Sequence, residues 1–348
     1  MDSCRKLSLV SELEPSLKRD EYFQKNNALT LFQTKAWYSA WHETWVSTIN
    51  SSSKLSIDET NKVYFAKHRV KKFLPITTMV PFGQGGPGLR SIRSEYFQPP
   101  MHSDDWLSTL IQLNRSEALL ADIPVNSPHL TALKSSATQN GQSVYERDRA
   151  TAYSVDTQTD TFQSYTSALG SNTRLKLVNR RKRLAAEGTV EIEDIWPNIN
   201  GFIELLNSFH QERWGKPCYQ GSNLEFIKKL LTRLPEEGHV VNLSVLKLDT
   251  KPVSLLLDIT IGERTYNLQG GFLESLVKGV SLGTLHFGYA IEAAFLNPTI
   301  NTYDFMAGEG KNSNYKEKIA NQSCELVSVV VVKNPILKFL YSLKKREV

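Results

Sequence analysis

The stretch YDFMAGEGKNSNYK, residues 303–316, decides the fold. Its first residues end a predicted strand over 301–306, Gly308 and Gly310 mark a loop, and a helix is expected to begin near Asn314. A strand that runs through a glycine loop into a helix is typical of a sheet covered by helices. The segments on either side should therefore continue the same alternation.

The elements predicted around this stretch do continue it. They run in the order strand, two helices, three strands that can pair antiparallel, helix, strand, helix and strand, which indicates a mixed sheet packed by helices. A basic helix over 172–187 precedes them, and a short basic helix ends the chain. The ranges are 189–195, 199–214, 224–234, 240–248, 252–261, 264–270, 284–295, 301–306, a helix from about 314, and 324–332.

The first half is less regular. Trp37, Trp41 and Trp45 recur every four residues and share one helical face, which predicts a core stripe. Strands are expected over 62–68, 74–80 and 145–155, and the segment 127–142 is expected to be a polar loop with a short helix. A chain of 348 residues favours two domains. We place the boundary near residue 155, which gives lobes of 1–155 and 156–348.

This order of elements resembles the GNAT acyltransferase fold. The resemblance is closest to the acetyltransferase family named for cellulose biosynthesis, which is related to the Fem-type peptidyltransferases. It rests on residues 303–316 and on LVNRRKRLAAEG (177–188), LLNSFHQERWG (205–215) and SLGTLHFGYAIEAAF (281–295), with LFQTKAWYSAWHETW (31–45) and residues 73–100 in the first half. It implies an α/β (α+β) fold of tandem GNAT-like lobes, the first degenerate, with mixed, mostly antiparallel sheets flanked by helices.

Composition sets the environment. The net charge of +5 suits a phosphate-bearing ligand, tRNA or an anionic membrane surface. Three separated cysteines without a CxxC motif argue against a disulfide framework, and the seven histidines show no metal-binding spacing, so we expect no metal. The charged N-terminus lacks the apolar core of a signal peptide, and the cytoplasm is the expected location.

The resemblance implies a donor site for acetyl-CoA or another acyl-CoA. A glycine turn and the start of the next helix would bind the pyrophosphate, because free backbone N–H groups and the helix dipole favour an anion. The strand before it would pair with the pantetheine arm, and two glycines there would allow a bulge. The residues are Lys278, Gly279, Ser281, Gly283 and Thr284 at the turn, and Gly270 and Gly271 on the strand.

The same resemblance suggests catalytic and acceptor groups. Asp304, at a strand end, would take a proton from the amine or hold it. Tyr315 would protonate the leaving thiolate, and Lys316 would stabilise an oxyanion or a phosphate. His210, Arg213 and Trp214 would line the acceptor groove, and Arg180 belongs to a basic helix that would dock a phosphate. Each residue also has an ordinary structural interpretation as core, cap or solvated surface.

Two other motifs point elsewhere. Gly279, Ser281 and Gly283 spell the Gly-x-Ser-x-Gly of serine hydrolases, but no strand is predicted before them and no histidine follows His286. Gly83, Gly85 and Gly88 match a dinucleotide fingerprint, but Pro87 and an extended segment stand where a helix should open. We therefore interpret both as turns.

The sequence predicts an N-acyltransferase that moves an acyl group, most simply acetyl, from CoA to an amine. The acceptor would be a small or sugar-linked amine, such as an amino sugar of a surface polysaccharide precursor. Two alternatives stay open: a Fem-like transferase that uses aminoacyl-tRNA, and a non-catalytic scaffold in a polysaccharide-synthesis complex. Association with a membrane surface or a polysaccharide synthase is also expected. Binding of nucleic acid is not expected, except for tRNA in the Fem-like alternative.

Overall fold

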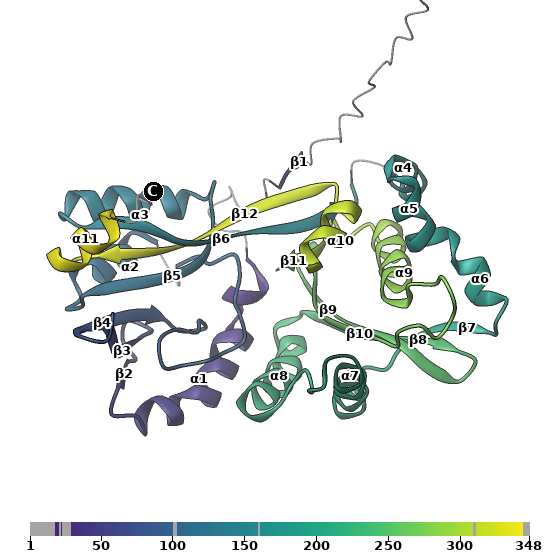
Figure 1. Cartoon of the computed structure of the whole chain (residues 1–348), viewed down its shortest axis with the longest axis horizontal. Coiled ribbons are helices and arrows are strands. Elements are labelled where there is room, and N and C mark those ends of the chain that lie inside the picture. Colours follow the sequence, from purple (N-terminus) through teal and green to yellow (C-terminus); the bar gives the residue numbers. More distant parts are fainter. Residues whose placement is uncertain are drawn as a thin grey trace, which may run out of the picture.

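The computed structural model describes residues 18–20, 22, 29–99, 103–158, 161–308 and 311–343. A single sheet of 12 strands runs through the molecule in the order β2-β3-β4-β5-β12-β6-β11-β10-β9-β8-β7, with β1 (Lys18–Arg19) pairing beside β12. Helices cover this sheet in two groups, one over each half (Figure 1). The fold is the mixed, mostly antiparallel α+β arrangement that the sequence predicts, with two helix-covered halves on a shared sheet.

The first lobe begins with a short 3-10 turn (Leu31–Gln33) and helix α1. The antiparallel strands β2, β3 and β4 follow, and β4 pairs in parallel with β5 through only two residue pairs, Thr78 with Glu117 and Met79 with Ala118. The bounds are α1 Lys35–Asn50, β2 Leu55–Asp58, β3 Val63–Val70, β4 Leu74–Pro81, α2 Ser103–Gln112, β5 Glu117–Pro124, α3 Pro128–Gln139 and β6 Ser143–Asp156.

The second lobe repeats this plan with more regular elements. Strands β7, β8, β9 and β10 pair antiparallel in series, and β10 then pairs in parallel with β11. The bounds are α4 Phe162–Ala168, α5 Ser171–Arg174, a π-helical segment Leu175–Asn179, α6 Arg181–Ala185, β7 Val190–Asp194, α7 Ile199–Trp214, α8 Gly221–Arg233, a 3-10 turn Leu234–Glu237, β8 Val240–Leu248, β9 Lys251–Ile261, β10 Arg264–Phe272, α9 Leu282–Leu296, β11 Thr302–Ala307 and α10 Lys311–Ile319.

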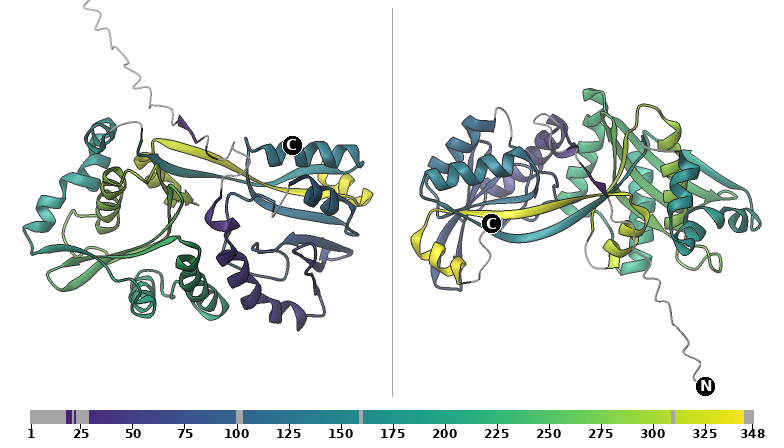
Figure 2. Two further views of the ribbon diagram at one scale, coloured as in Figure 1. Left: turned by 180° about the vertical axis from the view of Figure 1, so that it is seen from behind. Right: turned by 90° about the horizontal axis from the view of Figure 1, so that it is seen from above.

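The last strand returns to the first lobe. Strand β12 (Gln322–Val332) lies between β5 and β6 and pairs antiparallel with both, and α11 (Pro335–Ser342) then packs beside it. Figure 2 shows β12 and β6 as one long ribbon that joins the two halves. The boundary near residue 155 stays a prediction, but residues 322–342 clearly pack with the first lobe rather than with the segment that precedes them.

The tryptophan stripe forms the core of the first lobe, as predicted. Trp37 and Trp41 are fully buried and Trp45 nearly so. Trp37 and Trp45 both contact Phe226 of α8, with ring centroids 4.9 and 5.0 Å apart. The stripe therefore ties α1 to the second lobe as well. Truncating such a side chain to alanine typically costs about 3–5 kcal/mol.

Several elements were not predicted from the sequence. These are the strands β1, β2 and β5 and the helices α2 and α4, and mostly loop was expected where α3 lies. The basic helix over 172–187 is interrupted by the π-helical segment, where the carbonyl oxygen of Leu177 lies 2.0 Å from where a Cβ on Gly288 would stand. Only glycine allows α9 to approach that closely. Within the described residues, no helix is long and apolar enough to cross a bilayer.

Candidate active site

A cleft opens in the second lobe where two parallel strands part. Strand β10 pairs with β11 only from Arg264 to Tyr266, opposite Thr302 to Asp304. Beyond that point β10 stays with β9 as far as Phe272, while β11 follows β6. The inner edge of β10 thus presents backbone groups without a strand partner. Such an edge can bind an extended polar chain.

The N-terminus of α9 faces the same cleft. Ser281 is the N-cap residue, but its hydroxyl contacts the Thr284 hydroxyl at 3.0 Å instead of capping a backbone N–H. The first N–H groups of α9 are therefore left uncapped, next to the positive end of the helix dipole. Ser281, Gly283 and Thr284 all line the cleft, as the donor-site prediction requires.

The cleft has a volume of about 520 Å³ and is basic. Among the residues that the structure describes, its charged side chains are all cations, and no carboxylate or imidazole lines it. An enclosed cleft of one charge attracts a ligand of the other, here an anion. The cations are Lys176, Arg213, Lys316 and Lys318, and Asn172 and Thr173 add polar groups from α5.

The bulge in β10 lies two residues earlier than expected. The register shifts between Asn267 and Gln269, before Gly270 and Gly271, which both continue the strand. The glycines instead permit close packing, because a Cβ on Gly271 would lie 2.9 Å from a methyl of Leu206 on α7. The bulge therefore lies outside these two glycines, and both line the cleft that the splay of β10 and β11 opens.

Tyr315 and Lys316 both reach the cleft from α10. The Tyr315 hydroxyl makes no hydrogen bond within the described part of the chain, and burial raises its pKa to about 12 against the lowering effect of Arg213. Lys316 donates to the carbonyls of Phe305, Met306 and Ala307 at 2.6, 3.2 and 2.9 Å. Burial lowers the pKa of Lys316, while Glu95 and Asp304 oppose the shift.

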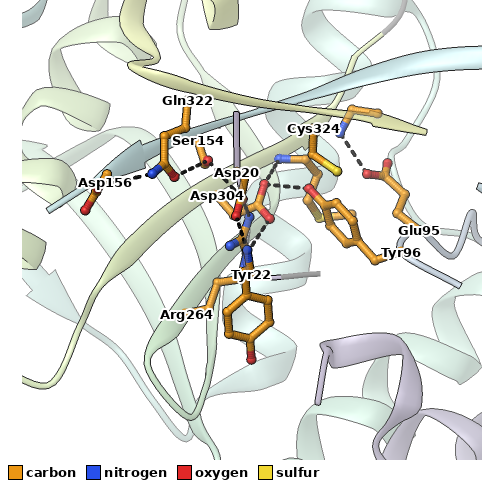
Figure 3. A network of polar contacts seen from close by, with 12 residues as sticks. Asp20, Tyr22, Glu95, Tyr96, Ser154, Asp156, Arg264, Asp304, Gln322 and Cys324 are labelled. Carbon is orange, nitrogen blue, oxygen red and sulfur yellow. Dashed lines mark hydrogen bonds and ion pairs between the residues drawn. The ribbon is translucent and has the colours of Figure 1, made fainter. Parts of the chain in front are cut away.

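Asp304 lies behind the cleft rather than in it. Its carboxylate is 0% exposed and accepts hydrogen bonds from Arg264 at 2.9 Å, from the Tyr96 hydroxyl at 3.0 Å and from the Met306 N–H at 2.6 Å. Arg264 also pairs with Asp20 in the same network (Figure 3). The prediction that Asp304 contacts the amine is not favoured by this placement, since its oxygens are committed to the junction between the lobes.

The acceptor candidates form one cluster at the cleft mouth. The Arg213 guanidinium lies over the rings of Trp214 and Phe272, 4.4 and 4.3 Å from their centroids, and pairs with Glu274 at 2.6 Å. Trp214 is half exposed and lines the cleft with Arg213. His210 lies just behind, 3.0 Å from the Gly270 carbonyl, and burial lowers its pKa. A neutral His210 that donates to this carbonyl fixes the strand edge.

The remaining donor candidates lie outside the cleft lining. Lys278 and Gly279 are exposed on the turn before α9. The guanidinium groups of Arg180 and Arg183 lie 3.9 and 3.7 Å from where a Cβ on Gly279 would stand. The basic helix and the glycine turn are therefore neighbours, and they form a cationic surface next to the N-terminus of α9.

The hydrolase and dinucleotide motifs are turns, as interpreted from the sequence. His286 is buried between the hydroxyls of Ser244 and Ser254, at 2.9 and 3.1 Å, and burial lowers its pKa to about 3. It is therefore no partner for Ser281. Gly86 and Leu89 form a tight bridge between strands, without a helix after the glycines. Within the described residues no cluster of side chains is arranged to hold a metal ion.

The sequence analysis missed several cleft residues. Asn267 donates to Asp258 at 2.7 Å and lines the cleft next to Gln269, and Lys318 lines the opposite wall. The bulge that turns Asn267 and Gln269 toward the opening leaves no signal in residue types, because both are ordinary strand-surface amides. Lys318 lies two residues after Lys316 on a helix that the sequence did predict, but residues two apart on a helix do not share a face, so this spacing gave no signal.

The splayed strands, the uncapped helix and the basic cleft lie together in the part of the chain that a known family model matches. Residues 171–317 match the family model described as the acetyltransferase (GNAT) domain, which covers the second lobe but less than half of the chain. The comparison with curated proteins gives no match.

Two solved structures share the fold of the whole chain. A structure of FemX superposes with a TM-score of 0.55 at 13% identity, covering 92% of this chain and 96% of that one. A conserved protein of unknown function from Bacteroides thetaiotaomicron gives a TM-score of 0.50 at 12% identity, covering 89% and 99%. At these identities the likeness establishes the fold and leaves the substrate open.

Proposed function

We propose that this protein is an N-acyltransferase that takes an acyl group, most simply acetyl, from an acyl-CoA thioester and transfers it to an amine. One observation carries the proposal: the gap between β10 and β11 lies next to the uncapped N-terminus of α9 in one basic cleft. The pantetheine arm would pair with the free edge of β10. The pyrophosphate would lie at Ser281, Gly283 and Thr284, where free N–H groups favour an anion.

The chemistry is a direct transfer. The amine lone pair attacks the thioester carbonyl, the C–S bond breaks, and the thiolate takes a proton from the Tyr315 hydroxyl as the amide forms. The ammonium proton of the acceptor leaves to water, because no described carboxylate or imidazole lines the cleft. Lys316 is held by three carbonyls and stays an ammonium close to the reaction, where it stabilises negative charge.

The acceptor would enter past Arg213 and Trp214. An indole face half exposed at the cleft mouth is suited to stack on a sugar ring or another flat apolar surface. The guanidinium beside it would bind a phosphate or carboxylate on the same acceptor. These two groups favour a sugar-linked amine from polysaccharide or envelope biosynthesis as the substrate class.

Calorimetric titration tests the donor. Acetyl-CoA, longer acyl-CoAs and CoA lacking the 3'-phosphate are titrated into the full chain at low and moderate salt, and amino sugars are then screened as acceptors. We expect saturable binding of acetyl-CoA, weakened by salt because the cleft is cationic. If no acyl-CoA binds while an aminoacyl-tRNA does, the Fem-like alternative replaces this proposal. If neither binds, the scaffold alternative does.

A further inference from the structure

The end of the first lobe farthest from the cleft carries an exposed apolar surface. Helix α11 buries Leu337 against the sheet and turns three large apolar side chains outward at spacings of three and four residues. They are Ile336, Phe339 and Leu343, which are 55%, 63% and 64% exposed. The helix therefore has two apolar stripes, one packed on the core and one exposed to solvent. An exposed apolar stripe of this kind typically marks a surface that binds another molecule.

The β3–β4 turn extends this surface. Phe73, at the tip of the turn, is 68% exposed. The end of β3 and helix α11 border one cavity, which Val70 and Tyr341 both line, so the turn and the helix are neighbours. Figures 1 and 2 place α11, β3 and β4 at the same end of the molecule. We call Phe73, Ile336, Phe339 and Leu343 the apolar end face.

Cations surround the apolar end face. Lys71 and Lys72 precede Phe73, and Lys333 precedes α11, and all three are exposed. The two described segments that lie at this end, residues 60–94 and 326–343, contain no aspartate or glutamate. The neighbouring acids are engaged: Glu117 accepts from Thr78 and Tyr341, and Glu146 pairs with Arg149. The charge around the face is therefore positive.

The turn is also built at a conformational cost. Lys71 and Lys72 both adopt positive φ angles, 48° and 68°, where glycine or asparagine would be favoured. Two lysines with positive φ angles make the fold less stable than glycine or asparagine would at the same positions. Backbone strain of this kind is found most often at binding surfaces. The strained turn projects Phe73 and both lysines beyond the sheet.

We propose that the apolar end face docks the protein on an anionic lipid bilayer. Exposed Phe, Ile and Leu side chains would insert at the headgroup level, and the lysines around them would bind lipid phosphates, the combination by which amphipathic helices bind membranes peripherally. The acyl-transfer cleft lies in the other lobe and stays open to solvent in this orientation. The proposal does not depend on the proposed function.

Vesicle co-sedimentation of the full chain tests this proposal. Vesicles of phosphatidylcholine alone are compared with vesicles that contain about one third phosphatidylglycerol, at low and high salt. We expect binding to the anionic vesicles only, weakened by salt. Ile336→Ser/Phe339→Ser/Leu343→Ser and Lys71→Gln/Lys72→Gln should each lower the partition coefficient at least about tenfold. These side chains are exposed, so the fold should survive, and unchanged acyl-CoA binding or far-UV circular dichroism confirms it.

Matched controls lie on the second lobe. Leu296→Ser removes a leucine that is 78% exposed, and Lys182→Gln/Lys251→Gln removes two exposed lysines. Both should bind vesicles as the unmodified protein does. Equal loss in the controls, or no preference for anionic vesicles, overturns the proposal. A dimer that the triple serine variant abolishes, without vesicle binding, also overturns it and assigns the face to a second copy of the chain.

Discussion

The two lobes share one plan, yet within the described residues the parted strands of the second lobe border a cleft, while a side chain bridges those of the first. In both, three antiparallel strands lead to a parallel pair that soon parts, β4 with β5 and β10 with β11. In the first lobe the side chain of Gln84 occupies the gap: it donates to the Ala121 carbonyl at 3.2 Å and accepts from the Ala121 N–H at 3.1 Å. In the second lobe the edge of β10 has no strand partner beyond Tyr266, although the Gly270 carbonyl lies 3.0 Å from His210 Nε2 and the Gly270 N–H donates to the Gln269 side chain at 3.0 Å.

The difference between the lobes shows that two strands that part do not by themselves form a ligand-binding site. After β4 the chain turns back at Gly83, whose φ is +84°, and so brings Gln84 across the gap. The glycines that match a dinucleotide fingerprint belong to this turn. Gly86, which lies among them, is packed too closely for a side chain, because a Cβ there would lie 2.7 Å from the Tyr64 hydroxyl. After β10 the chain instead leaves through Phe272, next to the start of α9. One lobe thus keeps the strand gap for a ligand, and the other closes it with its own amide.

The largest effect is expected at the junction between the lobes. Asp304→Asn keeps the shape of the side chain but removes the charge that Arg264 pairs with in a fully buried site. Breaking a buried ion pair typically costs about 3–5 kcal/mol. We expect the free energy of unfolding in urea to fall by that amount, in a transition that both lobes share, because Tyr96 of the first lobe binds the same carboxylate.

The same variant separates the structural from the catalytic interpretation of Asp304. Asp148→Asn, at an exposed position on β6, is the matched control and should unfold like the unmodified protein. Loss of turnover at unchanged stability would restore Asp304 to the catalytic role that the sequence suggested. Two separate unfolding transitions would show that the lobes fold independently.

The next effect tests the open gap. Thr284→Glu places a carboxylate in the first turn of α9, where the helix dipole favours it, so stability should hold or rise slightly. The same charge should repel the donor pyrophosphate, and we expect acyl-CoA affinity to fall at least about 100-fold by calorimetry. Thr284→Gln adds similar bulk without charge and should lose much less. Equal losses in the two variants would mean that bulk, and not an anion site, explains the result.

A substitution of Gln84, which bridges the gap in the first lobe, should lower stability and leave acyl-CoA affinity unchanged, the opposite of the result expected for Thr284→Glu. Gln84→Leu keeps the volume but removes the side-chain partners of the N–H and carbonyl of Ala121, which is partly buried. We expect the free energy of unfolding to fall by about 2–3 kcal/mol, with acyl-CoA affinity unchanged. Gln139→Leu, at the exposed end of α3, is the control. A loss of acyl-CoA affinity in Gln84→Leu would break the comparison, because it would place the donor in the first lobe.

Much of the fold was predictable because its signals are local. The tryptophan spacing predicts α1, and Gly215 ends α7 with a φ of 70°, as a C-cap glycine should. The missed elements depend on distant partners. Strand β5, EALLADIP, has weak strand character in sequence, and it is fixed by β12, which arrives some 200 residues later to pair with it. No local pattern in the sequence indicates that the last strand inserts into the first lobe.

The site was predictable in part for the same reason. The glycine and serine turn before α9 carries its own conformational signal, and the structure places Ser281, Gly283 and Thr284 in the cleft. The buried placement of Asp304 could not be predicted, because a strand-end aspartate looks the same in sequence whether it faces a cleft or a buried arginine. Its hydrogen-bond partners Arg264 and Tyr96, and Asp20, which pairs with Arg264, come from three separate regions of the chain, and only the fold brings them together.

The smallest effect concerns the chemical step within the open gap. Tyr315→Phe removes the hydroxyl that would protonate the leaving thiolate and keeps the ring that stacks on Phe287. We expect turnover to fall about tenfold while acyl-CoA affinity stays the same. Tyr289→Phe, on α9 under Arg181, is the matched control and should turn over normally. A thioester of an aromatic thiol, which leaves without a proton, should bring the kcat/KM of Tyr315→Phe close to that of the unmodified protein. If the deficit is the same with both thioesters, the Tyr315 hydroxyl contributes in some way other than protonating the thiolate, and the cleft has to draw its acid from water.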